Sequence, residues 1–208
     1  MGVEQVLVIR RRVFDELGAF HGLNFEIASY LERFWAGGDM LFMPRPQAEQ
    51  DPAYKQLIPY VIFACQGRYL CYVRGKRAGE TRLTARASIG IGGHINPADS
   101  QPLLGGFRAA YLNAVEREVA EEVTVRAAHA DRIVAMLNDD TNEVGAVHLG
   151  IVHCWRLEQP AVEKREQMIT NLAFLAPDEL RAMRGRMESW SQLCLDRIED
   201  IARLSNAD

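Results

Sequence analysis

Residues 107–125 have the sequence pattern of a long helix, and this segment constrains the fold of the chain more than any other. Within it, Arg117–Val123 reads Arg-Glu-Val-Ala-Glu-Glu-Val. Because residues three and four apart share a helix face, Glu118, Glu121 and Glu122 are predicted to lie on one side. Apolar residues on the other side are expected to pack into the core and hold the acids in place: Leu112, Val115, Val119 and Val123.

Three carboxylates crowded on one helix face repel one another, and a hard divalent cation would relieve that repulsion. Because oxygen ligands suit magnesium or manganese, the cluster predicts a Mg²⁺ or Mn²⁺ site formed by Glu118, Glu121 and Glu122. Arg117 lies one turn before Glu121 and can pair with its carboxylate. Taken alone, clustered glutamates more often form a solvated acidic helix face. The surrounding sequence is therefore needed to distinguish such a face from a metal site.

The exact residue order and the preceding segment favour a functional site. At ordinary residue frequencies, Arg-Glu-aliphatic-x-Glu-Glu arises by chance in on the order of one chain in a thousand. Residues 88–95 (SIGIGGHI) predict a strand that runs into a glycine-rich turn at Gly92 and Gly93. His94 follows this turn, so its backbone and side chain are expected to face the metal.

Apolar segments along the chain predict the other elements. Strands are expected at 5–10, 56–65, 69–74, 132–138, 146–156 and 171–176, with residues 66–68 closing a hairpin. Helices are expected at Asn24–Trp35 with Asn24 as its cap, from Pro177 onward, and at Glu188–Leu204. Strands interleaved with a few helices indicate an α/β fold with a mixed sheet covered by helices. A loop-rich stretch rich in glycine and proline separates an N-terminal extension, 1–52, from a main domain, 53–208.

At this point the chain resembles the Nudix family. The family's sequence box runs glycine, five residues, glutamate, seven residues, then Arg-Glu-aliphatic-x-Glu-Glu-x-Gly-aliphatic. Gly93 matches the first glycine, and Asp99 stands where the first glutamate is expected. Arg117, Glu118, Val119, Glu121, Glu122 and Val125 match the second half. The resemblance covers roughly residues 56–176 and implies an α/β/α sandwich with a mixed sheet, joined by an N-terminal extension and a C-terminal helix.

The box departs from the family pattern in two places. Seventeen residues, 100–116, separate Asp99 from Arg117 where the family has seven, and Thr124 replaces the closing glycine. An ungapped alignment would place Ala109 at the first acid, so the gapped one, which keeps both Gly93 and Asp99, is preferred. The inserted residues 100–106 (SQPLLGG) are expected to form a loop at the mouth of the site.

The resemblance also implies roles for individual residues. Glu118, Glu121 and Glu122 are the candidate metal ligands, and Glu118, Glu121 and Arg117 the candidate catalytic residues. Candidate substrate-binding residues are Gly92, Gly93, His94, Asp99 and Arg74, the last from a basic run before the box. Glu143 and Glu166 are additional candidate acids in loops, while Asp139, Asp140 and the strand histidine His148 are weaker candidates.

Composition limits the partners and the compartment. The formal net charge of −4 provides no global basic field for nucleic acid, so the expected partner is a small diphosphate substrate. No apolar run is long enough to cross a membrane. The four cysteines lack zinc-ligand spacing and are expected to be buried thiols, which indicates a cytoplasmic protein. An apolar N-terminal helix makes a homodimer a further expectation.

Two functions of different classes follow. The first is metal-dependent hydrolysis of a phosphoanhydride bond in a nucleoside diphosphate linked to another group. The second is a sensor that binds such a nucleotide without cleaving it, which the insertion and Thr124 favour and the three retained glutamates disfavour. An interaction protein with an acidic helix explains the glutamates but not the glycine turn or Asp99. A Nudix-fold isomerase is disfavoured because no cysteine lies in or near the box.

Overall fold

The computed structural model describes residues 2–74, 86–100, 106–165 and 169–206, with the side chain of Arg74 outside the described part. The chain divides into two compact units. Unit 1 consists of Met1–Tyr60, Gly92–Arg117 and Ala135–Ile151, and unit 2 of Val61–Ile91, Glu118–Val134 and Val152–Asp208. This division is discontinuous in sequence, and the predicted boundary at residue 52 stays a prediction.

The described strands are short except for three. They are β1 (Gln5–Arg10), β2 (Gly22–Asn24), β3 (Met40–Pro44), β4 (Tyr54–Cys65), β5 (Arg68–Arg74), β6 (Ala87–Ser88), β7 (Gly90–Gly92), β8 (Val123–Val125), β9 (His129–Asn138), β10 (His148–Leu157), β11 (Val162–Lys164) and β12 (Ile169–Leu175).

The described helices include one long α-helix. They are α1 (Arg11–Glu16), α2 (Ala28–Trp35), α3 (Arg45–Ala48), α4 (Gly106–Glu122), α5 (Glu143–Ala146), α6 (Pro177–Ala182), α7 (Ser189–Asp196) and α8 (Ile198–Asn206), with 3₁₀ turns η1 (Pro97–Asp99) and η2 (Arg184–Arg186). The longest of them, α4, has seventeen residues and carries Glu118, Glu121 and Glu122 near its C-terminal end.

Most strands belong to one ten-stranded sheet, whose main path is β12-β5-β4-β10-β9-β2. Off this path, β1 pairs with β3 and β4, β6 with β5, and β7 with β4, while β8 and β11 form a separate two-stranded sheet. The predicted mixed α/β fold is therefore confirmed.

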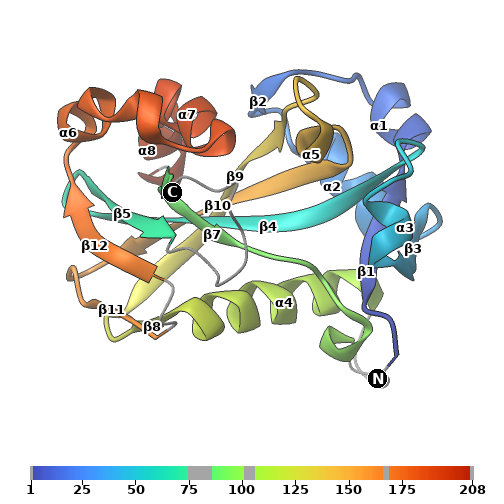
Figure 1. Ribbon diagram of the computed structural model, residues 1–208, viewed down its shortest axis with the longest axis horizontal. Coiled ribbons are helices and arrows are strands. Elements are labelled where there is room, and N and C mark those ends of the chain that lie inside the picture. The colour runs from blue at the N-terminus through green and yellow to red at the C-terminus, as the bar shows by residue number, and fades with distance from the viewer. Residues whose placement is uncertain (1, 75–85, 101–105, 166–168, 207–208) are drawn as a thin grey trace. The chain divides into compact units, whose positions relative to one another are not determined.

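In unit 1 the N-terminal extension is built into the sheet. β1 runs antiparallel to β3 and to the start of β4, with Val8 opposite Gln56 (Figure 1). The backbone N–H of Leu7 donates to the carbonyl of Ile95, just beyond the glycine turn. Residues from β1, β3 and α3 form a small buried cluster: Val6, Val8, Met43 and Ala48. The extension thus supports the strand that leads to the candidate site.

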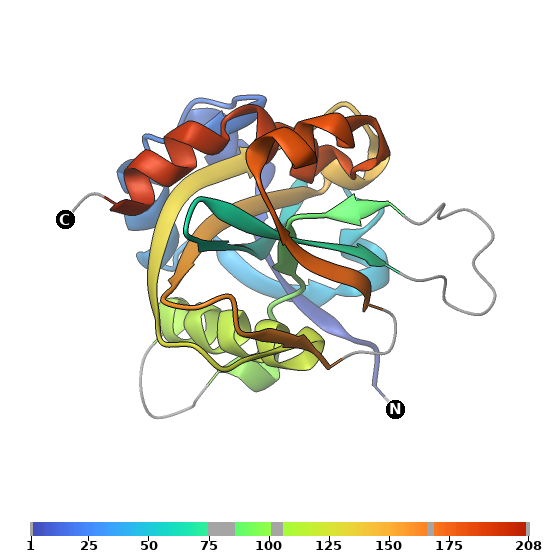
Figure 2. The same ribbon diagram turned by 90° about the vertical axis from the view of Figure 1, so that its left-hand side faces the viewer.

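In unit 2 the predicted hairpin between β4 and β5 is confirmed. Gln66 and Gly67 form its two-residue turn, and both have a positive φ, 50° and 75°. This conformation matches the right-handed twist of the two strands, and glycine adopts it without strain. β5 continues antiparallel to β12. Figure 2 shows the hairpin and β12 side by side, with α6, α7 and α8 above them in that view.

Several predicted element boundaries are wrong. The helix expected from Asn24 begins at Ala28, because Asn24 belongs to β2 and its side chain accepts the backbone N–H of Glu26 instead of capping a helix. The stretch expected to be loop contains β3 and α3. The region predicted as one C-terminal helix forms two helices, α7 and α8, which are separated at Arg197.

Local contacts explain where the C-terminal helices begin and end. Pro177 occupies the first turn of α6, as predicted, and Glu179 accepts the backbone N–H of Ala176 at 2.7 Å. At the break, Arg197 has a φ of −123° and donates to Asp200, in the first turn of α8. An acid in that turn also complements the helix dipole.

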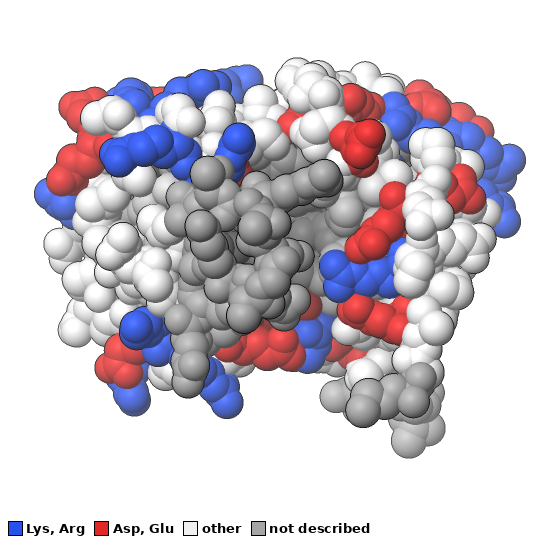
Figure 3. Space-filling model, viewed as in Figure 1, with Lys and Arg blue, Asp and Glu red and all other residues white. Residues whose placement is uncertain are grey.

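All four cysteines are free, so the fold contains no disulfide bond. Cys65, Cys71, Cys154 and Cys194 are buried free thiols, as predicted, and burial raises the pKa of Cys71 to about 11. Among the described helices, none combines the length and apolar character needed to cross a bilayer. Figure 3 shows basic and acidic side chains interspersed over the described residues of one face.

Candidate active site

The acidic cluster lies at the C-terminal end of α4. Glu121 is exposed, Glu118 is partly buried and Glu122 is 8% exposed, so the three carboxylates sit at different depths. Their helix is anchored by Val115 and Val119, which are 2% and 3% exposed, and by Val123 just beyond it. Leu112, expected on the same buried face, is instead 43% exposed, so its assignment to the core is wrong.

The end of α4 is capped by Arg165 in unit 2. Its backbone N–H donates to the carbonyl of Glu122 at 2.9 Å, and its guanidinium donates to the carbonyl of Ala120 at 2.8 Å. Both bonds satisfy carbonyl groups that a helix terminus leaves unpaired, and the charge complements the helix dipole. The last turn, which carries Glu121 and Glu122, is therefore fixed.

The helix stops at Glu122, three residues before its predicted end at residue 125. Val123–Val125 forms β8 and pairs with β11, with Thr124 opposite Glu163 (Figure 2). Thr124 thus extends a strand where the family box has a glycine. Two β-branched valines flanking a threonine favour this extended conformation.

In unit 1, Arg117 and Asp99 form a bidentate ion pair. Arg117 donates from Nε to Oδ1 at 2.7 Å and from Nη2 to Oδ2 at 2.9 Å. Asp99 is buried, and it also accepts the backbone N–H of Asn96. Asn113 of α4 donates to the Asp99 carbonyl at 2.9 Å. These contacts join the two halves of the box across the insertion, as the gapped alignment requires.

The glycine turn approaches a neighbouring strand closely. A Cβ atom at Gly92 would lie 2.1 Å from the carbonyl oxygen of Pro59, so only glycine fits there. Gly93 is partly buried, and the carbonyl of His94 accepts a hydrogen bond from Nη2 of Arg117 at 2.9 Å. The turn and the box arginine are therefore bonded directly.

The structure brings the two singled-out histidines together. Nε2 of His94 lies 3.4 Å from Nε2 of His148, and Nδ1 of His148 lies 2.6 Å from the carbonyl oxygen of Val144. Burial is the main cause that lowers the pKa of His94 to about 3, and the charges of Arg45 and Arg117 add to it. Burial likewise lowers the pKa of His148. Both rings are therefore neutral near physiological pH.

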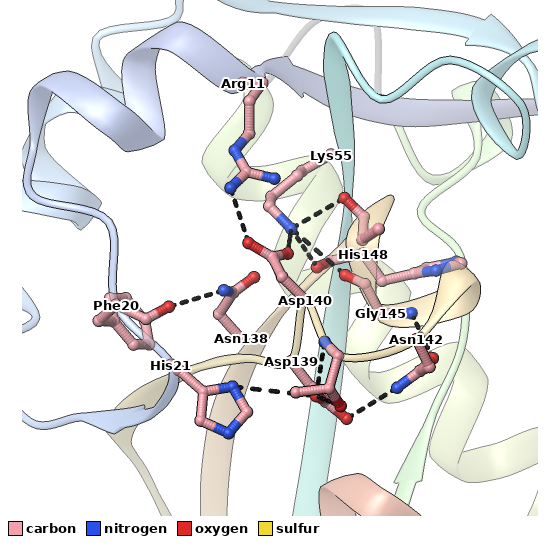
Figure 4. Close-up of polar contacts among 12 residues, drawn as sticks. Arg11, Phe20, His21, Lys55, Asn138, Asp139, Asp140, Asn142, Gly145 and His148 are labelled. Atoms are coloured by element: carbon pink, nitrogen blue, oxygen red, sulfur yellow. Dashed lines mark hydrogen bonds and ion pairs between the residues drawn. The ribbon is translucent and has the colours of Figure 1, made fainter.

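A buried lysine that sequence reasoning missed organises the loop between β9 and β10. Lys55 is fully buried, and its Nζ donates to Asp140 at 2.8 Å and to the carbonyls of Gly145, Ala146 and His148 at 3.0–3.3 Å (Figure 4). Arg11 also donates to Asp140. The only sequence signal is a lysine at the start of a long apolar strand.

The weaker candidate acids have structural partners. Asp139 is 1% exposed, and its carboxylate accepts hydrogen bonds from Thr141 and Asn142, so it is buried within its loop. Burial opposes ionisation of Asp140, but hydrogen bonds and charge from Lys55 outweigh it and lower its pKa. Glu143 is exposed in the first turn of α5.

Some predicted site residues lie outside the described part. They are Glu166, most of the insertion (101–105), most of the basic run, and the side chain of Arg74. Within the described residues, no group of three or more His, Cys, Asp or Glu side chains is arranged to hold a metal ion. The donors of the acidic cluster are nevertheless all carboxylate oxygens, which fits the chemistry of a hard divalent cation.

Comparison with known proteins adds independent information. No protein-family model matches the chain. Protein YmaB of Bacillus subtilis is 33% identical over 162 residues, which are 76% of this chain and 77% of YmaB. The structure of Tm1382, a protein assigned to the Nudix hydrolases, superposes with a TM-score of 0.79 at 29% identity, covering 95% of this chain and all of that one. The Nudix domain of Shewanella oneidensis NrtR, solved with ADP-ribose, has the same fold at 11% identity, a TM-score of 0.54, and coverage of 82% and 97%.

The mixed sheet, the glycine turn and the box helix together define a Nudix-type hydrolase. The chain belongs to the Nudix family, and the structure that it matches over 95% of its length is assigned to the Nudix hydrolases.

Proposed function

We propose that this protein uses a divalent metal ion to hydrolyse a phosphoanhydride bond in a nucleoside diphosphate linked to another group. The observation that carries the proposal is the bidentate bond between Arg117 and Asp99. It joins the two halves of the box despite the insertion, and so holds the residue that directly precedes Glu118.

The proposed metal ligands are Glu118, Glu121 and Glu122. Carboxylate oxygens suit Mg²⁺ or Mn²⁺ and disfavour soft metals. When bound, such an ion polarises a phosphoryl oxygen and lowers the pKa of a coordinated water. Arg165 caps the last turn of α4, and its two hydrogen bonds hold the backbone that carries Glu121 and Glu122.

The remaining roles belong to the chain itself. Asp99 is buried and fully engaged, so we assign it to positioning Arg117 rather than to contact with substrate. Glu118 and Glu121 remain the proposed catalytic carboxylates. Gly92, Gly93 and His94 are proposed to line the substrate site, because the turn that they form is bonded to Arg117. The engagement of Asp139 and Asp140 argues against either as general base.

The proposed substrate is a small molecule, and ADP-ribose is the first compound to test because a Nudix domain of the same fold was solved with it. Four buried free thiols support a reducing, cytoplasmic compartment. A homodimer remains a prediction for a measurement of mass in solution.

The test is a panel of nucleoside diphosphate compounds, including ADP-ribose, incubated with the protein in magnesium and in EDTA. We expect at least one compound to be cleaved in magnesium and spared in EDTA. Glu118→Gln and Glu122→Gln should each lower the rate about 100-fold, or about 3 kcal/mol of barrier. Glu116→Gln, an exposed acid on the other side of α4, is the matched control and should retain the wild-type rate.

The competing function is a sensor, and the same panel separates the two. A sensor would bind a compound tightly, turn over none of them in magnesium, and tolerate Glu118→Gln. That pattern would overturn the proposal of hydrolysis while leaving the family assignment intact.

A further inference from the structure

His94 and His148 point their imidazole nitrogens at each other. Their Nε2 atoms are 3.4 Å apart, whereas their ring centroids are 5.6 Å apart with planes inclined by 60°. The rings therefore meet nitrogen to nitrogen rather than face to face, so one Nε2 donates its N–H and the other Nε2 accepts that hydrogen bond. The distance of 3.4 Å is long for a hydrogen bond. If neither Nε2 carried a proton, however, two nitrogen lone pairs would face each other and repel.

The direction of this bond follows from the other nitrogen of His148. Its Nδ1 lies 2.6 Å from the carbonyl oxygen of Val144, and a carbonyl only accepts. Nδ1 of His148 must therefore carry the proton, which leaves its Nε2 as the acceptor in a neutral ring. His94 must then carry its proton on Nε2, and its Nδ1 keeps a lone pair.

The backbone that sets this arrangement is itself fixed. Nζ of the buried Lys55 donates to the carbonyl of His148 at 3.3 Å and to those of Gly145 and Ala146 (Figure 4). These bonds link the end of α5 to the start of β10. At the other end, Arg117 holds the carbonyl of His94. The backbone carbonyl of each histidine is therefore bonded to a side chain from another element.

The charges around the pair keep both rings neutral. Burial is the largest cause that lowers both pKa values, and Arg45 lowers both further. Arg117 acts in the same direction on His94, and Lys55 on His148. The Val144 carbonyl and Glu49 act in the opposite direction on His148 without reversing the shift. A neutral ring has one donor and one acceptor, so the tautomer decides what His94 can recognise.

The acceptor atom of His94 is available to a ligand. Among the residues that the structure describes, none donates a hydrogen bond to its Nδ1, and the side chain is only partly buried. It follows Gly92 and Gly93 directly, and its carbonyl is bonded to the box arginine. A neutral nitrogen lone pair repels phosphate oxygens but accepts from a hydroxyl or an amino group.

We propose that the His94–His148 pair fixes His94 as a neutral hydrogen-bond acceptor, through Nδ1, for a hydroxyl or amino group on the part of the substrate beyond its phosphates. This inference rests on the proposed function for the identity of the ligand but not for the state of the rings. His94 is then a specificity residue, and His148 is the positioning residue that sets its tautomer.

The ring states are tested first, without any substrate. The chain has five histidines, so a protein labelled with ¹⁵N-histidine gives a tractable NMR spectrum that reports the protonation of each ring nitrogen. We expect His94 protonated on Nε2 and His148 on Nδ1, with both rings neutral at about pH 7 and His94 still neutral at about pH 5, below the usual histidine pKa. His148→Phe should abolish the single tautomer of His94. A His94 ring protonated on Nδ1, or one that titrates like an ordinary histidine, overturns the proposal.

The ligand role is tested with ADP-ribose in magnesium, or with whichever compound of the panel is cleaved best. His94→Phe and His148→Phe should raise KM about tenfold with little change in kcat, as expected for one lost hydrogen bond between uncharged groups. His94→Asn and His148→Gln keep an acceptor at the corresponding atom and should restore most of the affinity. His129→Gln, a change in unit 2, is the control.

The outcomes separate this inference from the proposed function. If no compound is hydrolysed, the dissociation constant of ADP-ribose replaces KM and must show the same pattern. If the NMR spectrum shows the expected tautomers but the phenylalanine variants keep wild-type affinity, the pair is only structural and the proposed ligand role is wrong. A fall in kcat alone, rescued by neither conservative variant, also contradicts it.

Discussion

Removing the carboxylate of Asp99 should destabilise the protein and uncouple the two halves of the box. The side chain of Asp99 is 4% exposed and that of Arg117 is 30% exposed, so the pair is largely but not fully desolvated. Breaking a buried pair by removing one partner costs about 3–5 kcal/mol. Because Arg117 retains some contact with water, the lower end applies, and Asp99→Ala should lower the free energy of unfolding by about 3 kcal/mol.

A double-mutant cycle measured by urea unfolding isolates the pair itself. Asp99→Ala, Arg117→Met and the double variant should give a coupling energy of about 2 kcal/mol, typical of charge-assisted hydrogen bonds. The control pair is Arg126 and Glu163, which has the same bidentate geometry at 2.9 and 3.1 Å but is more than half exposed. Its coupling should be much smaller, because exposed pairs are screened.

The cycle also has a clear negative outcome. A coupling between Asp99 and Arg117 no larger than that of the exposed control pair would show that the bond does not hold the box together. In that case the gapped alignment would lose its physical basis, and the hydrolase proposal would lose the observation that carries it.

Three further predictions concern stability. Lys55→Met should cost about 3 kcal/mol, because it removes one of the two cations that bind Asp140 and the shared donor of three carbonyls, while Arg11 still donates to Asp140. The pKa of Asp140 is lowered in the folded state, so its contribution to stability is present above its unfolded pKa and is lost as pH falls through the folded value. Asp140→Asn should therefore flatten the acid side of a stability-against-pH curve. Gly92→Ala should lose about 3 kcal/mol or fail to fold, because the added carbon meets a backbone carbonyl at 2.1 Å; wild-type thermal stability would contradict this. Leu112→Gln should change the free energy of unfolding by less than about 0.5 kcal/mol, because Leu112 is exposed. The buried Val119 is the contrast, and Val119→Ala should lower the free energy of unfolding by about 2 kcal/mol. Equal effects of the two variants would contradict the exposure of Leu112.

The elements that local sequence encodes could be predicted. The hairpin at Gln66-Gly67 carries its own turn signal, and α4 is long enough for its periodicity to be read. Its end at Glu122 was missed because a helical pattern was extended through Val123–Val125, although three β-branched residues in a row favour a strand. Elements of three or four residues, such as α5 and β11, are too short for any periodicity to show.

The site was predictable only where its residues share one helix or one motif. The glutamates, Arg117 and Asp99 could be identified because the box has a fixed order. The contact between His94 and His148 joins positions 54 residues apart, and Lys55 reaches Asp140 across 85 residues. No single-sequence pattern encodes such contacts, because they depend on which strands become neighbours in the sheet.

The insertion in the box is compatible with an intact site on energetic grounds. Closing a flexible loop of seventeen residues rather than seven costs about 0.8 kcal/mol more, because the entropy of loop closure grows only with the logarithm of length. Even this is an upper bound, since residues 106–116 are already helical and only the segment before them adds chain to the loop. Against that cost stands a buried bidentate pair whose coupling we expect at about 2 kcal/mol. The bond between Asp99 and Arg117 is therefore strong enough to hold the two halves of the box together, and the length of the insertion is no argument against catalysis.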